Sequence, residues 1–227
     1  MYSLIFIILL SYLIGSIPFG LIVGKIAKGI DIRKYGSGNI GSTNVSRILG
    51  FKYGLMTQIG DILKGVVPTL IIAPIFYSKS PFQDYIPIND YTFIQILAGI
   101  AAVCGHIWTI FAGFRGGKGV NTAVGILIGL APIDLLISFG IFLLVLIISG
   151  YVSLGSIIAA ISFPTIMFIR ENIFKVSITG YSTLIVFAII LSLIIIFTHR
   201  SNIDRLLAKK ENRFNKLMIK NWTKKQQ

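Results

Sequence analysis

Of the 227 residues, 55% are hydrophobic and only 13% are charged, about half the charge of an ordinary soluble domain. This composition excludes a soluble globular protein and indicates a polytopic membrane protein. The net charge of +13 is compatible with nucleic acid, anionic lipid or anionic substrates, and the single Cys104 excludes a disulfide framework.

Seven apolar runs follow one another, at residues 2–24, 53–76, 92–112, 120–131, 133–149, 152–169 and 181–198. A helix needs about 20 apolar residues to cross a bilayer, and the run at 120–131 is short of that length. The first run lacks a charged n-region and a cleavage site, so we expect a retained span rather than a signal peptide. Ala131-Pro132 is the only break between the fourth and fifth runs. Two alternatives therefore remain: seven spans, or six with residues 120–149 forming one kinked helix.

The distribution of basic residues favours seven spans. With the N-terminus outside, 17 of the 21 Lys and Arg residues fall on the inner side, and Lys64 lies within a span. Cytoplasmic loops of membrane proteins carry an excess of basic residues, whereas six spans would export either the first loop or the tail. We expect an all-α polytopic protein with seven transmembrane helices, an outside N-terminus and a cytoplasmic C-terminus. The basic residues then left outside are Lys79, Arg170 and Lys175.

The first loop, residues 25–52, has an unusual composition for a connector. Its residues 37–47 read SGNIGSTNVSR, in which glycine allows sharp turns and Arg47 offers a bidentate fork for an oxyanion. This suits a phosphate-binding loop, although a turn followed by a helix N-cap would have the same composition. The candidate turn residues and donors are Gly36, Ser37, Gly38, Asn39, Gly41, Ser42, Thr43 and Asn44.

The glycine segment, residues 113–120, reads GFRGGKGV and resembles a phosphate nest that leads into a helix. It is not a Walker A loop, because Lys118 is followed by Gly119 where that motif needs Ser or Thr, so an ATPase is excluded. A flexible hinge with two interfacial anchors is the alternative interpretation. The candidate phosphate-binding residues here are Arg115, Gly116, Gly117, Lys118 and Gly119.

Four ionisable residues lie in or beside apolar runs. Asp61 and Lys64 are three positions apart on one helix, which predicts a structural ion pair near the inner face rather than a direct role with substrate. His106 precedes the glycine segment by seven residues, and His199 closes the last run. No ligand spacing indicates a metal site.

Two segments outside the membrane receive simpler interpretations. The outer loop at residues 77–90 is expected to be an ordinary connector. Residues 199–227 form a basic, partly amphipathic tail, expected to lie on anionic lipid as a cytoplasmic extension of a membrane domain spanning residues 1–198.

Several motifs in order resemble those of the bacterial acyl-phosphate:glycerol-3-phosphate acyltransferases, the PlsY family. Residues 37–47 look like the family's first motif, residues 105–120 (GHIWTIFAGFRGGKGV) like the second, and His199-Arg-Ser-Asn202 like the third, after YVSLGS at residues 151–156. Four positions depart from the pattern: Ser42 and Asn121 where the family usually has Ala, Trp108 for Phe and Arg115 for Lys.

The resemblance implies transfer of a fatty acyl group from acyl phosphate to the sn-1 hydroxyl of glycerol 3-phosphate, giving lysophosphatidic acid for phospholipid biosynthesis. It also implies a multi-pass protein of the bacterial cytoplasmic (inner) membrane, with its motifs at the cytoplasmic face. Neither a cofactor nor nucleic acid is expected, and the implied partner is the enzyme that makes acyl phosphate.

The same resemblance assigns roles to individual residues. Catalytic roles fall to Ser37, Arg47, His199 and Asn202. The expected phosphate-binding residues are Gly38, Asn39, Gly41, Thr43, Asn44, His106, Arg115, Gly116, Gly117, Lys118, Gly119 and Ser153.

Acyl phosphate is already activated, so catalysis needs positioning, oxyanion stabilisation and removal of one hydroxyl proton. His199 is the candidate general base, and an oxygen of a substrate phosphate is the rival proton acceptor. A transporter of phosphorylated metabolites is the alternative function, although it would need polar groups near mid-membrane and usually two repeats. A non-catalytic scaffold would leave the glycine-rich segments unexplained.

Overall fold

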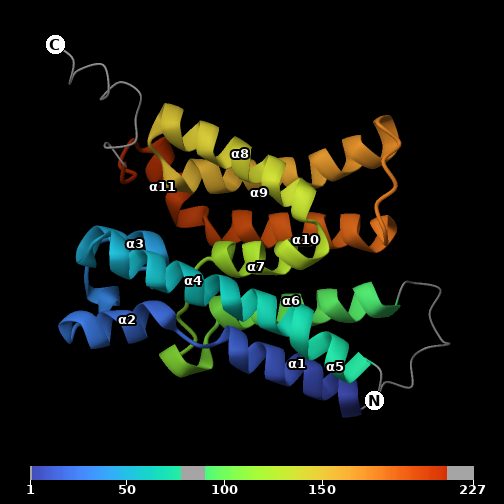
Figure 1. The fold of residues 1–227 in the computed structure, drawn as a ribbon. Coiled ribbons are helices and arrows are strands. Elements are labelled where there is room, and N and C mark those ends of the chain that lie inside the picture. Colours follow the sequence, from blue (N-terminus) through green and yellow to red (C-terminus); the bar gives the residue numbers. More distant parts are fainter. Residues whose placement is uncertain (1, 78–89, 214–227) are drawn as a thin grey trace. The chain divides into compact units, whose positions relative to one another are not determined.

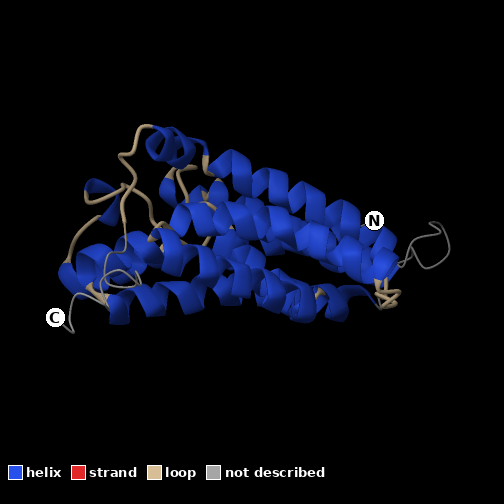
Figure 2. Cartoon of the chain, turned by 90° about the horizontal axis from the view of Figure 1, so that it is seen from above, coloured by secondary structure: helices blue, strands red, loops and turns tan. Residues whose placement is uncertain are grey.

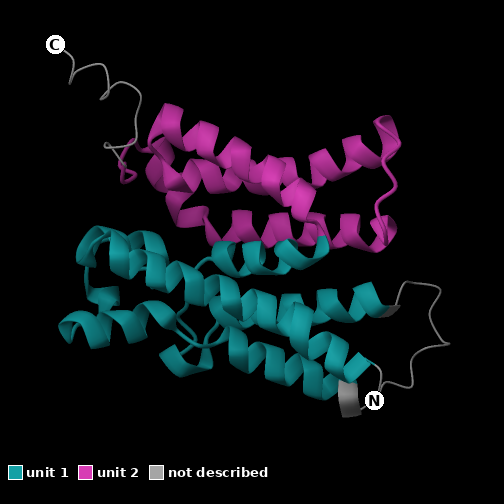
Figure 3. Ribbon diagram, viewed as in Figure 1, with its two compact units in different colours: residues 1–130 teal, residues 131–227 magenta. Residues whose placement is uncertain are grey.

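The computed structural model describes residues 2–77 and 90–213, and within these two ranges every regular element is helical (Figure 2). The predictions for the outer loop and for the tail beyond residue 213 concern residues largely outside these ranges. The chain divides into two compact units, residues 1–130 and residues 131–227 (Figures 1 and 3).

Unit 1 begins with two helices and ends with a short apolar one. Its helices are α1 (Tyr2–Gly15), α2 (Phe19–Lys28), α3 (Ser42–Leu49), α4 (Phe51–Val67), α5 (Ala73–Tyr77), α6 (Asp90–Ile107) and α7 (Val120–Leu130). Short 3₁₀ turns lie at Ile32–Lys34 and Ile110–Ala112, and a π-helical turn at Pro68–Ile72 joins α4 to α5. Unit 2 contains α8 (Pro132–Ser149), α9 (Val152–Phe168), α10 (Tyr181–Thr198) and α11 (Arg200–Leu207), with a π-helical turn at Ile169–Ile173.

Six helical segments among the described residues are long and apolar enough to cross a membrane. They are Leu4–Lys28, Phe51–Tyr77, Tyr91–Ala112, Pro132–Ser149, Val152–Ile173 and Tyr181–Thr198. The seventh apolar helix, α7, has 11 residues and is therefore about 16 Å long, against a hydrocarbon core of about 30 Å. Residues 120–149 do not form one continuous helix, because Ala131, with φ −151° and ψ 62°, interrupts the helix before Pro132. The choice between six and seven spans stays a prediction.

The first predicted run is likewise not one straight helix. α1 ends at Gly15 and α2 begins at Phe19, on either side of Pro18, which has no N–H to continue the helical ladder. At this break the Lys64 Nζ atom of α4 donates a hydrogen bond of 2.9 Å to the carbonyl oxygen of Ile17. A buried side chain of one span therefore satisfies the backbone of another.

Close helix packing positions the two loops of unit 1. α1 packs along α6, and α4 packs along α7. Glycines face the partner backbone at both contacts: a Cβ on Gly105 of α6 would collide with the Tyr12 carbonyl oxygen, and one on Gly65 of α4 with that of Thr122. Small residues at such contacts let membrane helices approach closely. The ends of α6 and α7 that carry the glycine segment are thereby held against α1 and α4.

In unit 2, α9 contacts both α8 and α10. An ion pair of 2.7 Å between Arg170 and Asp134 joins the end of α9 to the start of α8. Ser192 of α10 donates a hydrogen bond to the Ala160 carbonyl oxygen of α9. His199 separates α10 from α11, so the last predicted motif begins where the last long apolar helix ends.

Candidate active site

The first loop is built around the side-chain amide of Asn44, which is 2% exposed. Its Oδ1 atom accepts a hydrogen bond from the Ser37 N–H at 2.9 Å. Its Nδ2 atom faces the carbonyl oxygens of Ile32, Tyr35 and Asn39 at 3.3, 3.1 and 2.9 Å. Burial and these four contacts therefore give Asn44 a role in shaping the loop, and its expected contact with a phosphate stays a prediction.

A second polar contact within the first loop involves Asn39. The Asn39 Oδ1 atom accepts a hydrogen bond of 2.8 Å from the Gly41 N–H, immediately before α3 begins. The Gly41 N–H and the Asn39 amide oxygen are therefore paired with each other, while the expected contacts of Asn39 and Gly41 with a phosphate stay a prediction. Gly36 and Gly38 have φ values of +60° and +71°, a conformation that favours glycine.

Three other predicted residues of the first loop lie at its turn or on α3. Ser37 is exposed at the turn, Thr43 lies in the first turn of α3, and the half-buried Arg47 lies in its last turn. α3 is short and begins directly after Gly41. Thr43 and Arg47 therefore lie on a helical part of the first loop.

The glycine segment folds back onto the end of α6. Gly116 and Gly117 donate their N–H groups to the carbonyl oxygens of Ile107 and His106, at 3.0 and 3.1 Å. An added Cβ on Gly116 would collide with the His106 carbonyl oxygen. These two N–H groups are therefore engaged with α6, and the expected phosphate nest stays a prediction. Gly116 and Gly117 position the segment, while its cationic side chains, Arg115 (exposed) and Lys118 (half-buried), are the groups suited to an anion.

At its far end the glycine segment leads into α7. Gly119 has φ +82° and its carbonyl oxygen accepts the first helical hydrogen bond, from the N–H of Ala123 at 2.8 Å. A helix start leaves several N–H groups without intrahelical acceptors, and its dipole favours negative charge. The start of α7 beside Lys118 is therefore the part of this segment that retains the predicted character of an anion site.

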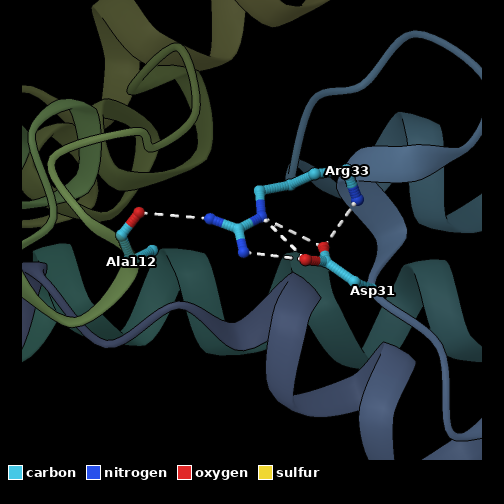
Figure 4. Close-up of polar contacts among 3 residues, drawn as sticks. All are labelled: Asp31, Arg33 and Ala112. Carbon is cyan, nitrogen blue, oxygen red and sulfur yellow. Dashed lines mark hydrogen bonds and ion pairs between the residues drawn. The ribbon is translucent and has the colours of Figure 1, made fainter.

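The two predicted segments meet within unit 1. Arg33 of the first loop donates from Nη1 to the Ala112 carbonyl oxygen at 3.2 Å, immediately before the glycine segment (Figure 4). Asn121, immediately after that segment, donates from Nδ2 to the Ser42 hydroxyl at 2.9 Å. Arg33 is a residue that the sequence-based site omitted; the only available signal was its place in Asp31-Ile32-Arg33, shortly before Ser37.

A buried charged cluster underlies the glycine segment. The predicted pair is confirmed: Lys64 Nζ lies 2.9 Å from Asp61 Oδ1, and each side chain is 2% exposed. His106 Nδ1 lies 3.6 Å from the same Asp61 oxygen. A Cβ on Gly117 would meet the His106 ring at Nε2, so this histidine packs beneath the segment. Its burial gives it a supporting place under the loop, and its expected contact with a phosphate stays a prediction.

Unit 2 contains a second polar cluster, centred on Glu211. Its Oε1 atom accepts hydrogen bonds from Ser153 at 3.0 Å and Asn202 at 2.7 Å, and its Oε2 atom accepts one from Arg205 at 2.7 Å. Ser153 and Asn202 were predicted as site residues, whereas Glu211 was missed. The sequence feature that could have indicated Glu211 is that it is an isolated acidic residue within a strongly basic tail.

Electrostatics keep Glu211 ionised. Burial pushes the pKa of its carboxyl group upward, but the hydrogen bonds from Arg205, Asn202 and Ser153 outweigh burial and hold the pKa below its ordinary value. The charged carboxylate therefore ties the residues after α11 to the start of α9.

His199 and Asn202 are the remaining predicted site residues of unit 2. The His199 ring is buried, and its Nδ1 atom lies 2.7 Å from the Ile195 carbonyl oxygen. A carbonyl oxygen only accepts, so Nδ1 carries the hydrogen and Nε2 is the acceptor of the neutral ring. The Asn202 N–H donates to the His199 carbonyl oxygen at 2.8 Å. Its Oδ1 atom is buried and accepts no hydrogen bond from the described residues.

The predicted site residues thus fall into two groups. Unit 1 holds the first loop, the glycine segment and His106, which the contacts above bring together. Unit 2 holds Ser153, His199 and Asn202, which gather around α9 to α11. Over residues 2–77 and 90–213, no cluster of three or more metal-ligating side chains occurs.

Comparison with known proteins gives consistent matches. A family profile described as glycerol-3-phosphate acyltransferase matches residues 5–209. A protein named glycerol-3-phosphate acyltransferase from Chlorobium phaeobacteroides is 47% identical, over 94% of this chain and 97% of its own. One of the same name from Chlorobaculum tepidum is 45% identical, over 95% and 98%.

Two solved structures are also similar. Both are crystal structures of PlsY, an integral membrane glycerol 3-phosphate acyltransferase, in a glycerol 3-phosphate form and a lysophosphatidic acid form. Each is 39% identical to this chain and covers 93% of it, and the alignments include 96% and 95% of the PlsY chains. The TM-scores are 0.78 and 0.76.

Proposed function

The chain belongs to the glycerol-3-phosphate acyltransferase family, and from this membership we propose that it transfers a fatty acyl group to glycerol 3-phosphate in a membrane. The donor in this proposal is acyl phosphate, the acceptor is the sn-1 hydroxyl, and the product is lysophosphatidic acid. The PlsY structures with glycerol 3-phosphate and with lysophosphatidic acid support the acceptor and the product.

The observation that carries this proposal is the linkage of two cation-bearing segments in unit 1. Arg33 and Asn121 tie the first loop to the two ends of the glycine segment. Arg47 and Lys118 then stand on neighbouring supports, each suited to one phosphate. A reaction between two phosphate-bearing substrates needs such a pair of anion sites.

The chemistry is a single acyl transfer. The acceptor's hydroxyl oxygen forms a bond to the acyl carbon, the bond from that carbon to the phosphate oxygen breaks, and inorganic phosphate leaves. The hydroxyl proton passes either to His199 Nε2 or to an oxygen of a substrate phosphate. The Nδ1 hydrogen bond to Ile195 supports the first route, because it orients the ring with Nε2 as the acceptor.

Polar side chains position the reactants in this scheme. Ser37 is exposed in the first loop, and in this scheme its hydroxyl orients the reacting centre. In unit 2, the Asn202 Oδ1 atom is a buried acceptor without a partner among the described residues, and a substrate hydroxyl would satisfy it. Because acyl phosphate is already activated, neither ATP nor a cofactor enters the scheme. The supply of this donor requires an enzyme that makes acyl phosphate.

We place the site at the cytoplasmic face of a bacterial inner membrane. The argument is the distribution of charge, with 17 of 21 basic residues on one side when all seven apolar helices cross. This topology requires α7 to cross despite its length, with the bilayer thinned around it. Residues 199–227 then lie in the cytoplasm.

The proposed function is tested with purified protein in detergent or vesicles. Acyl phosphate and labelled glycerol 3-phosphate are expected to give labelled lysophosphatidic acid, while acyl coenzyme A gives none. Product from acyl coenzyme A alone would refute acyl phosphate as the donor. Uptake of label into vesicles without any new lipid would refute acyltransferase activity and indicate a transporter.

A further inference from the structure

Two side-chain hydrogen bonds join the first loop to the glycine segment, and they sit at its two ends. The Arg33 bond reaches Ala112, the last residue before the segment, and Asn121 is the first residue after it. Between them, the N–H groups of Gly116 and Gly117 hold the middle of the segment to α6. The segment is therefore fixed to α6 in its middle and to the first loop at both ends.

The geometry of Arg33 makes it a bridge rather than a cation available to a ligand. Its Nε atom lies 3.0 and 3.2 Å from the two Asp31 carboxylate oxygens, and its Nη2 atom lies 2.7 Å from the second (Figure 4). The Arg33 backbone N–H also donates to that carboxylate at 3.0 Å. Asp31 thus holds one edge of the guanidinium, which leaves Nη1 aimed at the Ala112 carbonyl oxygen.

The Asp31 side of the bridge is ionised at any working pH. The side-chain and backbone hydrogen bonds from Arg33 hold the pKa of the Asp31 carboxyl group down to about 2. The guanidinium charge therefore always has a matched carboxylate beside it, and its long-range attraction for a substrate anion is reduced accordingly. Arg33 therefore acts by fixing the position of Ala112.

We propose that Arg33 and the Ser42–Asn121 pair are positioning residues, which hold both ends of the glycine segment against the first loop and so set the spacing between Arg47 and Lys118. This inference rests on the proposed function and takes the glycine segment, with Lys118, as the anion site for glycerol 3-phosphate. When either link is lost, the segment keeps its attachment to α6 but its cationic side chain shifts relative to the first loop. Binding of glycerol 3-phosphate weakens before the chemical step is affected.

The Arg33 link is tested by steady-state kinetics with three variants. Arg33→Ala is expected to raise the KM for glycerol 3-phosphate roughly tenfold, as for loss of one hydrogen bond from a charged group, with kcat and the KM for acyl phosphate nearly unchanged. Arg33→Lys is expected to be as defective as Arg33→Ala, because one ammonium cannot replace a fork that binds a carboxylate and a carbonyl in different directions. Lys34→Ala, which removes an exposed charge from the same turn, is the matched control and should keep the wild-type KM.

The second link is tested by a double-mutant cycle. Ser42→Ala and Asn121→Ala are each expected to raise the same KM by about threefold, the usual effect of one neutral hydrogen bond. The double variant should be no worse than either single variant, because both remove one shared bond. Fully multiplicative effects would show that Ser42 and Asn121 act separately and would overturn this half of the inference.

The three variants also distinguish an effect of the Arg33 charge from an effect of its hydrogen bonds on the position of the glycine segment. If Arg33→Lys keeps the wild-type KM while Arg33→Ala and Lys34→Ala raise it equally, the effect is charge alone and the inference fails. It also fails if Arg33→Ala binds glycerol 3-phosphate normally. If Arg33→Ala does not yield folded protein by size-exclusion chromatography, Asn121→Ala decides by the same KM criterion. A wild-type protein that makes no lysophosphatidic acid would instead refute the proposed function itself.

Discussion

Asn44 is the single side chain on which the shape of the first loop most depends. Replacing it with Ala removes all four of its contacts and leaves buried backbone groups without partners, so we expect a loss of about 2–4 kcal/mol in stability and little activity. Asn44→Asp keeps the acceptor for Ser37 but turns a second oxygen toward three carbonyl oxygens. It should therefore be no better than Ala. Thermal unfolding in detergent measures both, and a near-wild-type Asp variant would contradict the role given to Nδ2.

His199 offers a test of proton transfer against positioning. His199→Asn retains an N–H that can donate to the Ile195 carbonyl oxygen but has no basic nitrogen, whereas His199→Ala has neither. If His199 is the general base, kcat should fall by about 10² to 10⁴ in both variants. Single-turnover measurements with protein of checked folding and substrate binding would decide. An Asn variant close to wild type would assign the proton to a substrate phosphate instead.

At the scale of elements, Glu211 fastens the end of α11 to the start of α9, and this attachment should depend on pH. The pKa of Glu211 is lowered in the folded protein from 4.5, so its stabilisation is complete above that pH and is lost as the pH falls through the lowered folded value. Hydrogen exchange of residues 200–211 should accelerate on acidification below 4.5, relative to the rest of unit 2. The same segment in Glu211→Gln should exchange faster at neutral pH and show no such transition.

Local spacing predicted some contacts of these elements well and others poorly. The Asp61–Lys64 pair follows from two residues three apart on one helix, and it is confirmed. The directions of the Gly116 and Gly117 N–H groups depend instead on how the segment folds against His106, which composition does not encode. Glu211 reaches Ser153 across 58 positions, so no local pattern could connect them.

At the scale of the whole molecule, cysteine labelling tests whether α7 crosses the bilayer. In a Cys104→Ala background, single cysteines at positions 34 and 209 flank α4 to α10, and one at 175 lies between α9 and α10. An impermeant maleimide applied to intact cells is expected to label position 175 only. Positions 34 and 209 should react after permeabilisation. Labelling of either one from outside, with the other protected, would show that α7 does not cross.

At this same scale, the sequence predicted which segments are apolar helices but not how they group. Hydropathy and the positive charges predicted the all-helical class and the order of the apolar helices. A bilayer requires backbone polar groups to be hydrogen-bonded within each span, and basic loops favour its cytoplasmic side. The break at Ala131, which also divides the two units, was visible only as Ala131-Pro132. Ser42 and Asn121 stood out separately as departures from the family pattern, and only the fold makes them partners.

The bend in the first span has a consequence for the buried ion pair. Lys64 does more than balance Asp61, because it donates to the Ile17 carbonyl oxygen where the helix is broken. Its ammonium adds a second donor to a carbonyl oxygen that also accepts from the Phe19 N–H at 3.1 Å. A homologue that straightened this segment would lose this use of the lysine, and without the lysine the buried aspartate would keep only His106 beside it among the described residues, at 3.6 Å. The kink and the two charges are therefore expected to occur together, or to be absent together, among homologues.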